Sequence, residues 1–532
     1  MAEEAPYTCQ RHAPLAAGGR AKPFVDGALT FIDGVVAPWA GRIDAVSSPV
    51  YDDATGERAV IGKLSSLDGE ASLSAVKAAA KAWDEGQGEW PQMALSGRVA
   101  AVEAYLVALA ESREAIIEAL MWEIAKTAKD AAAEFDRTME FARAVLAHVK
   151  TSDAGPLGSW TTVDGIRARV RRGPVGVTLM LAPFNYPLNE MYAMMIPALV
   201  MGNCIVLKLP AIGALAHVLS IDALKRTLPP GVVNFVSGSG RATLPPVMES
   251  GLVDCLGFIG GSKGADALIK QHPHPHRLRV FSQLEGKNLG VVLSDADLDV
   301  SAREIVAGAL AYNGQRCTAI KLVAAHRSVA DALVAKIAAL VDALPRGLPW
   351  SPGTAITPLP ETGKPAFLEA LLSDAVGKGA KIVNAGGGDV AGALFTPAVV
   401  YPINQKMRLF HEEQFGPVVP VWAFDDVADV VAALKSSWNG QQAAIFTQSE
   451  TESAVLVDAL STIVGRINLN LQCKRGPDEF PFSGRRSSAM GTMSTTEALR
   501  AFSVETLVAT RPLDADLAAK LDAAATFLAP LE

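Results

Sequence analysis

The chain has 532 residues, of which 50% are apolar, 20% charged and 6% aromatic, a composition typical of globular proteins. Since domains usually hold about 150 residues, this length excludes a single small domain. The net charge of −8, with no dense cluster of Lys and Arg, argues against nucleic acid and anionic membranes as partners.

The first residues, Met1–Pro6, are acidic and lack the basic start and apolar core of a signal peptide, so we expect a cytosolic protein. The best apolar run, Tyr192–Met201, is much shorter than the roughly 20 residues of a membrane span and contains Pro197. This run predicts a buried helix. The five cysteines are widely spaced and form no CxxC motif, which indicates neither a disulfide framework nor a zinc site.

Segments with helical periodicity alternate with short β-branched runs along most of the chain, which is typical of an α/β fold. The predicted helices are 72–83, 97–110, 116–149, 302–311, 329–344 and 427–436. The runs that suit central strands of a parallel sheet are 175–181, 204–207, 232–236, 289–293 and 322–325.

Two segments, 159–172 and 499–511, alternate polar and apolar residues and are flanked by Gly or Pro, which predicts exposed β-ribbons. Because an uncovered strand edge usually pairs with another strand, we interpret them as an oligomerisation arm. Such an arm would build a homodimer or a homotetramer. The alternative is a solvated hairpin within one subunit.

Cys317 lies in a loop directly after a predicted helix, where Asn313 and Gly314 leave the backbone free to turn. The neighbouring Arg316 would favour the thiolate, because a nearby positive charge lowers the pKa of a thiol. A cysteine in a loop is more often inert, so both interpretations stay open at this point. A thiol hydrolase would also require a histidine, and His276 and His326 lie in no recognisable partner motif.

Six motifs occur in the order and at the separations seen in the aldehyde dehydrogenase superfamily, which the chain resembles over about residues 60–510. They are Leu-Ala-Pro-Phe-Asn-Tyr-Pro at 181–187; Pro-Ala-Leu at 197–199 with Gly-Asn at 202–203 and Lys208; Phe-Ile-Gly-Gly-Ser at 258–262; Gly-Lys-Asn at 286–288 with Asp-Ala-Asp-Leu at 295–298; Gly-Gln-Arg-Cys-Thr-Ala at 314–319; and Glu-Gln-Phe-Gly-Pro at 413–417.

The resemblance implies an α/β fold with three parts. They are a Rossmann-like cofactor-binding domain (1–157 and 173–284), an α/β catalytic domain (285–495), and a β-ribbon oligomerisation arm with a C-terminal tail (158–172 and 496–532).

The resemblance also implies a thioester mechanism. Cys317 would attack the aldehyde carbon, and the Asn185 amide and the Cys317 backbone N–H would bind the resulting oxyanion. Hydride would pass to the nicotinamide, and water would hydrolyse the thioester to the acid. Asn185 has an alternative interpretation as a turn residue before Pro187.

For the cofactor, the resemblance implies contacts from a set of positions, namely Lys208 at the adenosine ribose, Gly260 and Gly261 near the pyrophosphate, and Glu413 with Phe415 at the nicotinamide ribose. Members that prefer NAD usually carry a Glu three residues after the lysine, whereas this chain has Ala211. Ala211 offers no carboxylate that would repel a 2′-phosphate, and Lys208 can pair with one, so we predict NADP. Two other glycine clusters, 238–240 and 386–388, lack the third glycine of a dinucleotide fingerprint and are interpreted as loops.

A narrower resemblance, carried by 184–187, 314–319 and 475–482, is to the non-phosphorylating, NADP-dependent glyceraldehyde-3-phosphate dehydrogenases. It implies that the substrate phosphate is held by Arg137, Tyr186, Arg316 and Arg475, since a fork of guanidinium groups suits a phosphate dianion. Each residue also has a simpler interpretation: a helix-surface charge for Arg137, a packing ring for Tyr186, a thiolate partner for Arg316, and a salt-bridged loop residue for Arg475.

The chain departs from the superfamily at its base motif, Glu-Leu-Gly-Gly-Lys. Gln283 stands where the glutamate belongs, and Glu285 stands where the first glycine belongs. Glutamine cannot accept a proton from water at neutral pH. We predict that Glu285 acts as the general base, with a slow deacylation that lacks this base as the alternative. Ile259 also replaces a usual threonine and removes one hydroxyl near the cofactor.

The cluster His272–His276 alternates His and Pro, which would extend the chain and bring three rings toward one side. We interpret it as a surface loop between two strands, and we predict no metal.

Together, these features predict a cytosolic glycolytic enzyme that oxidises glyceraldehyde 3-phosphate to 3-phosphoglycerate with NADP and water, without inorganic phosphate. The alternatives are another aldehyde or semialdehyde dehydrogenase, or a non-catalytic nucleotide-binding member of the fold.

Overall fold

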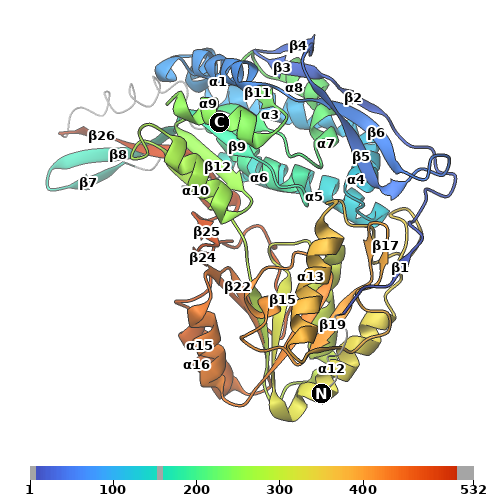
Figure 1. Ribbon diagram of the computed structural model, residues 1–532. Helices are drawn as coiled ribbons and strands as arrows, with labels where there is room; N and C mark the ends of the chain where they lie inside the picture. Colours follow the sequence, from blue (N-terminus) through green and yellow to red (C-terminus); the bar gives the residue numbers. More distant parts are fainter. Residues whose placement is uncertain (1–6, 152–159, 512–532) are drawn as a thin grey trace.

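The computed structural model describes residues 7–151 and 160–511. Two sheets built mainly of parallel strands organise this part of the chain, one above the other, and a ribbon projects to one side (Figure 1). Met1–Pro6, the start of the predicted arm at 158–159 and the tail 512–532 lie outside the described residues.

The first sheet has six strands in the order β11-β10-β9-β12-β13-β25. Their bounds are Val233–Val236 (β11), Cys204–Lys208 (β10), Val177–Leu181 (β9), Cys255–Ile259 (β12), Arg279–Gln283 (β13) and Ala489–Met490 (β25, antiparallel). β12 pairs in parallel with β13, and Ile259 lies opposite Gln283. The segments that follow these two strands therefore leave the sheet at the same edge, where α/β folds bind ligands.

Helices α1 and α6 pack against this sheet, and α3, α5 and α17 (Thr495–Ala501) pack on α6. The helices of this half are α1 (Gly69–Trp83), η1 (Asp84–Gly86), α2 (Glu89–Gln92), α3 (Leu95–Ala110), α4 (Arg113–Glu123), α5 (Ala128–Thr151), α6 (Pro187–Val200), α7 (Leu215–Val218), α8 (Ile221–Thr227), α9 (Gly240–Glu249) and α10 (Ser262–Gln271). The predicted apolar run 192–201 lies mostly in α6, which is almost completely buried.

The second sheet has seven strands in the order β16-β19-β20-β15-β14-β22-β23. Their bounds are Lys381–Ile382 (β16), Ala398–Tyr401 (β19), Val418–Phe424 (β20), Ile320–His326 (β15), Asn288–Val292 (β14), Gln442–Phe446 (β22) and Arg466–Leu469 (β23). Alternate residues of β15 enter two separate apolar clusters, Leu322 on one side and Val323 on the other. Both faces of this sheet are thus buried, which explains the unbroken apolar run in the sequence.

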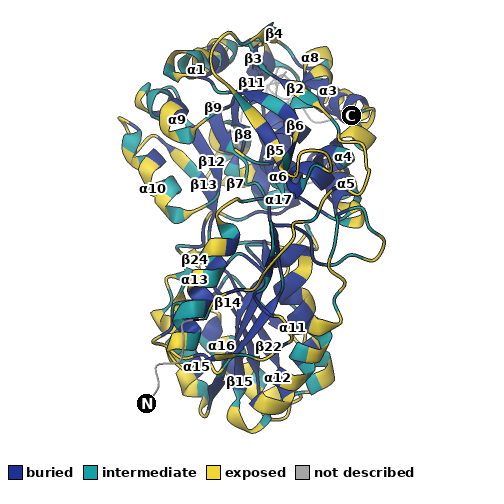
Figure 2. Cartoon of the chain, turned by 45° about the vertical axis from the view of Figure 1, so that its right-hand side comes forward, coloured by how far each residue is buried: buried dark blue, intermediate teal, exposed yellow. Residues whose placement is uncertain are grey.

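The helices around the second sheet are α11 (Leu298–Leu310), η2 (Ala311–Gly314), α12 (Arg327–Asp342), α13 (Lys364–Gly377), α14 (Arg408–His411), α15 (Val427–Ser436) and α16 (Glu450–Leu460). Figure 2 shows the strands of both halves as largely buried, with exposed residues gathered on the outer helices and loops. Within the described residues no single helix is both long and apolar enough to span a membrane, although α1–α2 and α3 pass that test as a pair bent by 91°.

The strands outside the two main sheets complete the fold. They are β1 (Arg11–His12), β2 (Val25–Gly27), β3 (Leu29–Ile32), β4 (Val35–Pro38), β5 (Ile43–Tyr51), β6 (Arg58–Ser65), β17 (Val390–Ala391), β18 (Leu394–Phe395), β21 (Asn439–Gly440) and β24 (Arg485–Arg486). Two strand pairings join the parts of the chain on either side of the predicted division at 284/285. β1 of the first part pairs with β17 of the second, and β25 of the second part pairs with β13 in the first sheet.

The two predicted ribbons form one sheet. β7 (Thr161–Val163), β8 (Ile166–Pro174) and β26 (Ser503–Thr510) follow the order β26-β8-β7. The prediction that 499–511 is entirely ribbon is wrong at its start, because residues up to Ala501 belong to helix α17 (Thr495–Ala501). The Ser494 side chain caps that helix by accepting a hydrogen bond from the Glu497 backbone N–H.

The predicted single helix 116–149 is also wrong, since it is broken between α4 and α5. Ala125 adopts a left-handed φ of 52° in the break. The next residue, Lys126, is completely buried and forms an ion pair with the equally buried Glu134. The other Glu134 oxygen accepts hydrogen bonds from the backbone N–H groups of Leu188 (3.1 Å) and Asn189 (3.2 Å) at the start of α6. This pair therefore ties the helix break to α5 and α6.

We predict that K126M or E134Q alone lowers the free energy of unfolding by about 3–5 kcal/mol, because either change leaves an unpaired charge buried. The free energy of unfolding of the double variant K126M/E134L should fall by much less than the sum of the decreases in the two single variants. Urea denaturation of the three variants measures this difference. Single losses near zero would contradict a buried, mutually dependent pair.

Candidate active site

A cavity of about 500 Å³ lies between the carboxyl ends of β9, β12 and β13 and the amino ends of β14, β15 and β20. All the predicted site residues except Lys208 and Ala211 line it, namely Cys317, Asn185, Glu285, Gly260, Gly261, Glu413, Phe415, Arg137, Tyr186, Arg316 and Arg475. The fold therefore gathers residues from distant parts of the chain around one space.

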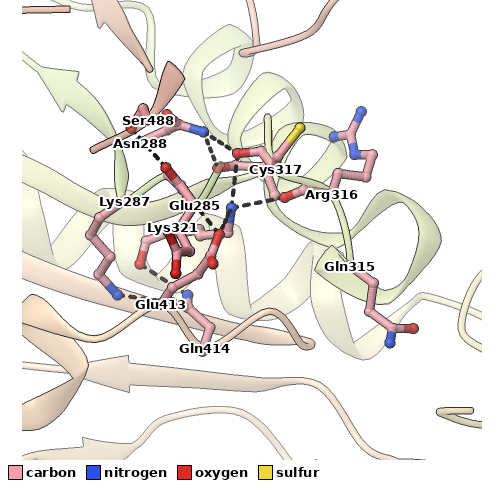
Figure 3. Close-up of polar contacts among 12 residues, drawn as sticks. Glu285, Lys287, Asn288, Gln315, Arg316, Cys317, Lys321, Glu413, Gln414 and Ser488 are labelled. Atoms are coloured by element: carbon pink, nitrogen blue, oxygen red, sulfur yellow. Dashed lines mark hydrogen bonds and ion pairs between the residues drawn. The ribbon is translucent and has the colours of Figure 1, made fainter. Parts of the chain in front are cut away.

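The Cys317 loop is held from one side by polar contacts (Figure 3). Lys321 Nζ donates hydrogen bonds to the backbone oxygens of Arg316 (2.8 Å) and Cys317 (2.9 Å), and it pairs with Glu413 Oε1 at 2.7 Å. The Asn288 side chain donates a second hydrogen bond to the Cys317 oxygen at 2.8 Å. These contacts fix the backbone that carries the thiol.

Burial raises the pKa of the Cys317 thiol to about 11, and the Glu190 carboxylate adds to this rise, while Lys321 lowers the pKa. Arg316, which was expected to favour the thiolate, is not among the groups with the largest effects on this pKa. Its guanidinium group instead donates to the backbone oxygen of Gly308 at 2.8 Å, near the end of α11. Lys321, which was not predicted from the sequence, is a cation that lowers this pKa, and the Arg475 guanidinium also interacts electrostatically with Cys317.

Asn185 follows β9 and is buried. Its side-chain nitrogen donates one hydrogen bond to the Gln315 backbone oxygen at 2.8 Å, which holds the amide beside the nucleophile loop. The amide group has a second N–H, so one donor is left for an oxyanion. Its predicted role is chemically possible in this position.

The two residues of the altered base motif have different environments. Gln283 is 2% exposed, lines the cavity, and has no hydrogen-bond partner for either side-chain polar atom among the described residues. Glu285 lines the same cavity, but its two carboxylate oxygens each lie 2.9 Å from the backbone nitrogen of Ser262 at the start of α10. In this arrangement the carboxylate binds a helix start and not the thiol, so its role as general base stays a prediction.

Two of the three arginines of the predicted phosphate site, Arg137 and Arg475, already have acidic partners. Arg475 Nη1 lies 2.7 Å from Glu190 Oε1, and Arg137 Nη2 lies 3.0 Å from Asp478 Oδ1. Glu190 was not predicted from the sequence, although it lies one helical turn after Tyr186 and such residues share a helix face. These ion pairs hold the guanidinium groups at the cavity wall before a substrate binds.

Lys208 and Ala211 line a neighbouring cavity of about 1080 Å³. Two further cations, Arg241 and Lys263, line it together with one carboxylate, Asp44. Burial lowers the pKa of Lys208 to about 8. This lining fits the adenosine 2′-phosphate of NADP, because several cations surround the space and Ala211 contributes no charge.

The glycine cluster 238–240 and the segment His272–His276 lie outside the Cys317 cavity. The glycine cluster 238–240, interpreted above as a loop, also lines this second cavity. The segment His272–His276 lies between α10 and β13, not between two strands, and His272 Nε2 contacts the Val253 backbone oxygen at 3.0 Å. Within residues 7–151 and 160–511, no group of three His, Cys, Asp or Glu side chains is arranged to hold a metal.

We predict that alkylation of Cys317 by iodoacetamide speeds up about tenfold per pH unit between roughly pH 7 and pH 10. Only the thiolate reacts, and its fraction rises tenfold per unit below a pKa near 11. Peptide mass spectrometry at several pH values measures the rate, with the fully buried Cys204 as an internal control that stays unlabelled. A rate that levels off below about pH 8 would contradict the raised pKa.

Comparisons with known proteins agree with this architecture. The aldehyde dehydrogenase family model matches residues 43–508. An NADP-dependent glyceraldehyde-3-phosphate dehydrogenase from Streptococcus equinus is 34% identical over 85% of this chain and 93% of its own length, and one from Pisum sativum is 33% identical over 80% and 84%. The crystal structure of NADP-dependent glyceraldehyde-3-phosphate dehydrogenase from Bacillus halodurans C-125 complexed with NADP superimposes with a TM-score of 0.84 and 32% identity, covering 92% of this chain and all of that one. This chain belongs to the aldehyde dehydrogenase family.

Proposed function

We propose that this aldehyde dehydrogenase oxidises glyceraldehyde 3-phosphate to 3-phosphoglycerate with NADP and water, without consuming inorganic phosphate. One observation carries the proposal: the cysteine nucleophile and the three arginines Arg137, Arg316 and Arg475 line a single cavity of about 500 Å³. A cavity of this size suits a small metabolite. The relatives that carry this activity in their names support the same substrate.

The arginines give the cavity the donors that a phosphate dianion requires. Arg475 is 9% exposed, so a hydrogen bond from its guanidinium group is shielded from water. Glu190 orients Arg475 and Asp478 orients Arg137. A bound phosphate would accept hydrogen bonds from the same two guanidinium groups. Lys364 and Lys474 also line the cavity and add positive charge.

The reaction begins with the Cys317 thiolate, whose attack forms a bond to the aldehyde carbon. The Asn185 amide stabilises the oxyanion that forms, and its preorganised position accounts for part of the catalysis. When bound, NADP would supply the nicotinamide ring that accepts the hydrogen of the aldehyde carbon with its electron pair. What remains on the protein is a thioester between Cys317 and the acyl group.

Hydrolysis of that thioester requires a base for water. Water attacks the acyl carbon, its proton passes to the base, and the Cys317 sulfur leaves. Gln283 cannot take the proton, so we propose that Glu285 takes it from a position inside the cavity that it already lines.

NADP is supported by the cations Lys208, Arg241 and Lys263 around the second cavity. We further propose that the protein works in the cytosol, in glycolysis, as a homodimer or homotetramer. The ribbon of β7, β8 and β26 supports the assembly, because its side chains Val163, Ile166 and Leu507 are apolar and exposed.

We predict that purified protein forms NADPH from NADP and glyceraldehyde 3-phosphate without added phosphate. In R137Q the KM for glyceraldehyde 3-phosphate should rise about tenfold, since a lost charge-assisted hydrogen bond costs about 1.5 kcal/mol. Activity with uncharged glyceraldehyde should stay unchanged. The matched control is R327Q, an exposed arginine that also pairs with one aspartate, Asp425. Activity with succinic semialdehyde but none with glyceraldehyde 3-phosphate would favour the semialdehyde alternative.

We predict that E285Q releases one NADPH per active site in a burst and then turns over about 10²–10⁴-fold more slowly than the wild type, because the general base is lost. Q283A should turn over steadily. Stopped-flow absorbance, with mass spectrometry of an acyl adduct on Cys317, measures both effects. A wild-type protein that itself stops after one turnover would favour deacylation without a base, and one that forms no adduct at all would favour a non-catalytic nucleotide-binding protein.

A further inference from the structure

The start of helix α10 is a wall shared by the two cavities. Gly260 and Gly261, just before the helix, line the cavity that holds Cys317. Lys263 and Gly264, in its first turn, line the cavity that holds Lys208. A dinucleotide with its adenosine in one cavity and its nicotinamide in the other must therefore pass its pyrophosphate over this helix start.

The helix start is suited to an anion. The N-cap residue of α10 is Gly261, which has no side chain to accept a hydrogen bond from the first turn. The free N–H groups and the helix dipole favour a negative charge there.

In this structure the anion is a side chain of the protein itself. Both carboxylate oxygens of Glu285 lie 2.9 Å from the Ser262 backbone nitrogen, and Oε1 lies 3.3 Å from Ser262 Oγ. A Cβ atom on Gly261 would lie 3.1 Å from Glu285 Oε1, so the glycine allows the carboxylate to come this close. In the part of the chain that the structure describes, Ser262 is the only hydrogen-bond or ion-pair partner of this carboxylate.

A second, independent feature lies in the same cavity. Gln283 brings a buried amide to the cavity wall two residues before Glu285, and its oxygen and nitrogen lack partners within the described residues. Leaving such a group unpaired costs free energy, so it is expected to bind something that enters the cavity. Its N–H groups are suitable donors for a carboxylate.

We propose that Glu285 and the pyrophosphate of NADP are alternative occupants of the α10 start, so that the cofactor binds only as the Glu285 carboxylate leaves it. This inference rests on the proposed function, because it takes NADP as the ligand. Two anions at one helix start would lie within about 4 Å of each other and repel, so the site holds one at a time.

The displaced carboxylate remains on the wall of the catalytic cavity, near the amide of Gln283 and on the same space as Cys317. Cofactor binding then supplies the base that the altered motif lacks at its usual position. Glu285 is thus both the competitor of the cofactor and the group that the cofactor releases for deacylation.

The test is a calorimetric titration of wild type, E285A and E285Q with two ligands, NADP and adenosine 2′-monophosphate. The second ligand has no pyrophosphate that could take the place of Glu285 at the Ser262 N–H. We expect the Kd of E285A for NADP to fall about tenfold, because a charge-assisted hydrogen bond no longer has to be broken. E285Q should bind NADP more tightly than the wild type too, since it removes the charge but keeps the shape. The Kd for adenosine 2′-monophosphate should be the same in all three proteins.

The matched control is D426N, which removes an exposed carboxylate that caps a different helix by accepting a hydrogen bond from the Ala428 N–H at 2.8 Å. Its Kd for NADP should equal that of the wild type. An unchanged or weaker Kd in both Glu285 variants, with adenosine 2′-monophosphate still bound, would overturn the competition and leave the proposed function standing. Failure of every protein to bind either ligand would overturn the NADP assignment and the competition with it.

Discussion

The buried ammonium group of Lys321 is the contact on which the geometry of the active site depends. It binds the backbone oxygens of Arg316 and Cys317 and pairs with Glu413, while its side chain is only 1% exposed. In a trans peptide the C=O and the following N–H point in opposite directions. Binding the Arg316 oxygen therefore turns the Cys317 N–H away from the ammonium, which leaves it free to act as the second oxyanion donor that the family resemblance implies. One cation thus orients the nucleophile loop and also stabilises its thiolate.

Sequence periodicity predicted several of the long helices and five of the thirteen strands in the two main sheets, β9, β10, β11, β14 and β15, because these elements carry their signal locally. It failed at the break between α4 and α5, where tertiary contacts of Lys126 and Glu134 outweigh a continuous helical pattern. A local cue was present: Thr127 caps α5 by accepting a hydrogen bond from the Asp130 N–H at 3.1 Å, and a Thr followed three residues later by an acid is a common helix start. The predicted ribbon 499–511 was wrong at its start because a similar local signal was overlooked. Ser494 caps α17 by accepting a hydrogen bond from the Glu497 N–H.

Motif order also predicted which residues meet at the cavity, but not the direction of their long side chains. Arg316 points to the end of α11 and Glu285 to the start of α10, and both directions are set by backbone groups of another element, 8 and 23 positions away in the sequence. Glu190 escaped notice because its importance comes from the ion pair with Arg475, nearly 300 positions away. Spacing along a chain predicts neighbours on one helix or strand, whereas pairs between elements depend on packing that no single segment encodes.

The raised pKa of Cys317 has a consequence for the lifetime of the protein in an oxidising cell. Peroxides and other oxidants attack thiolates far faster than thiols, and sulfinic and sulfonic products are irreversible. Because burial and the Glu190 carboxylate keep the sulfur protonated near neutral pH, the resting enzyme presents a poor target to such oxidants. Burial of the nucleophile, with the Glu190 carboxylate adding to its effect, therefore makes the sulfur less sensitive to oxidative inactivation between turnovers.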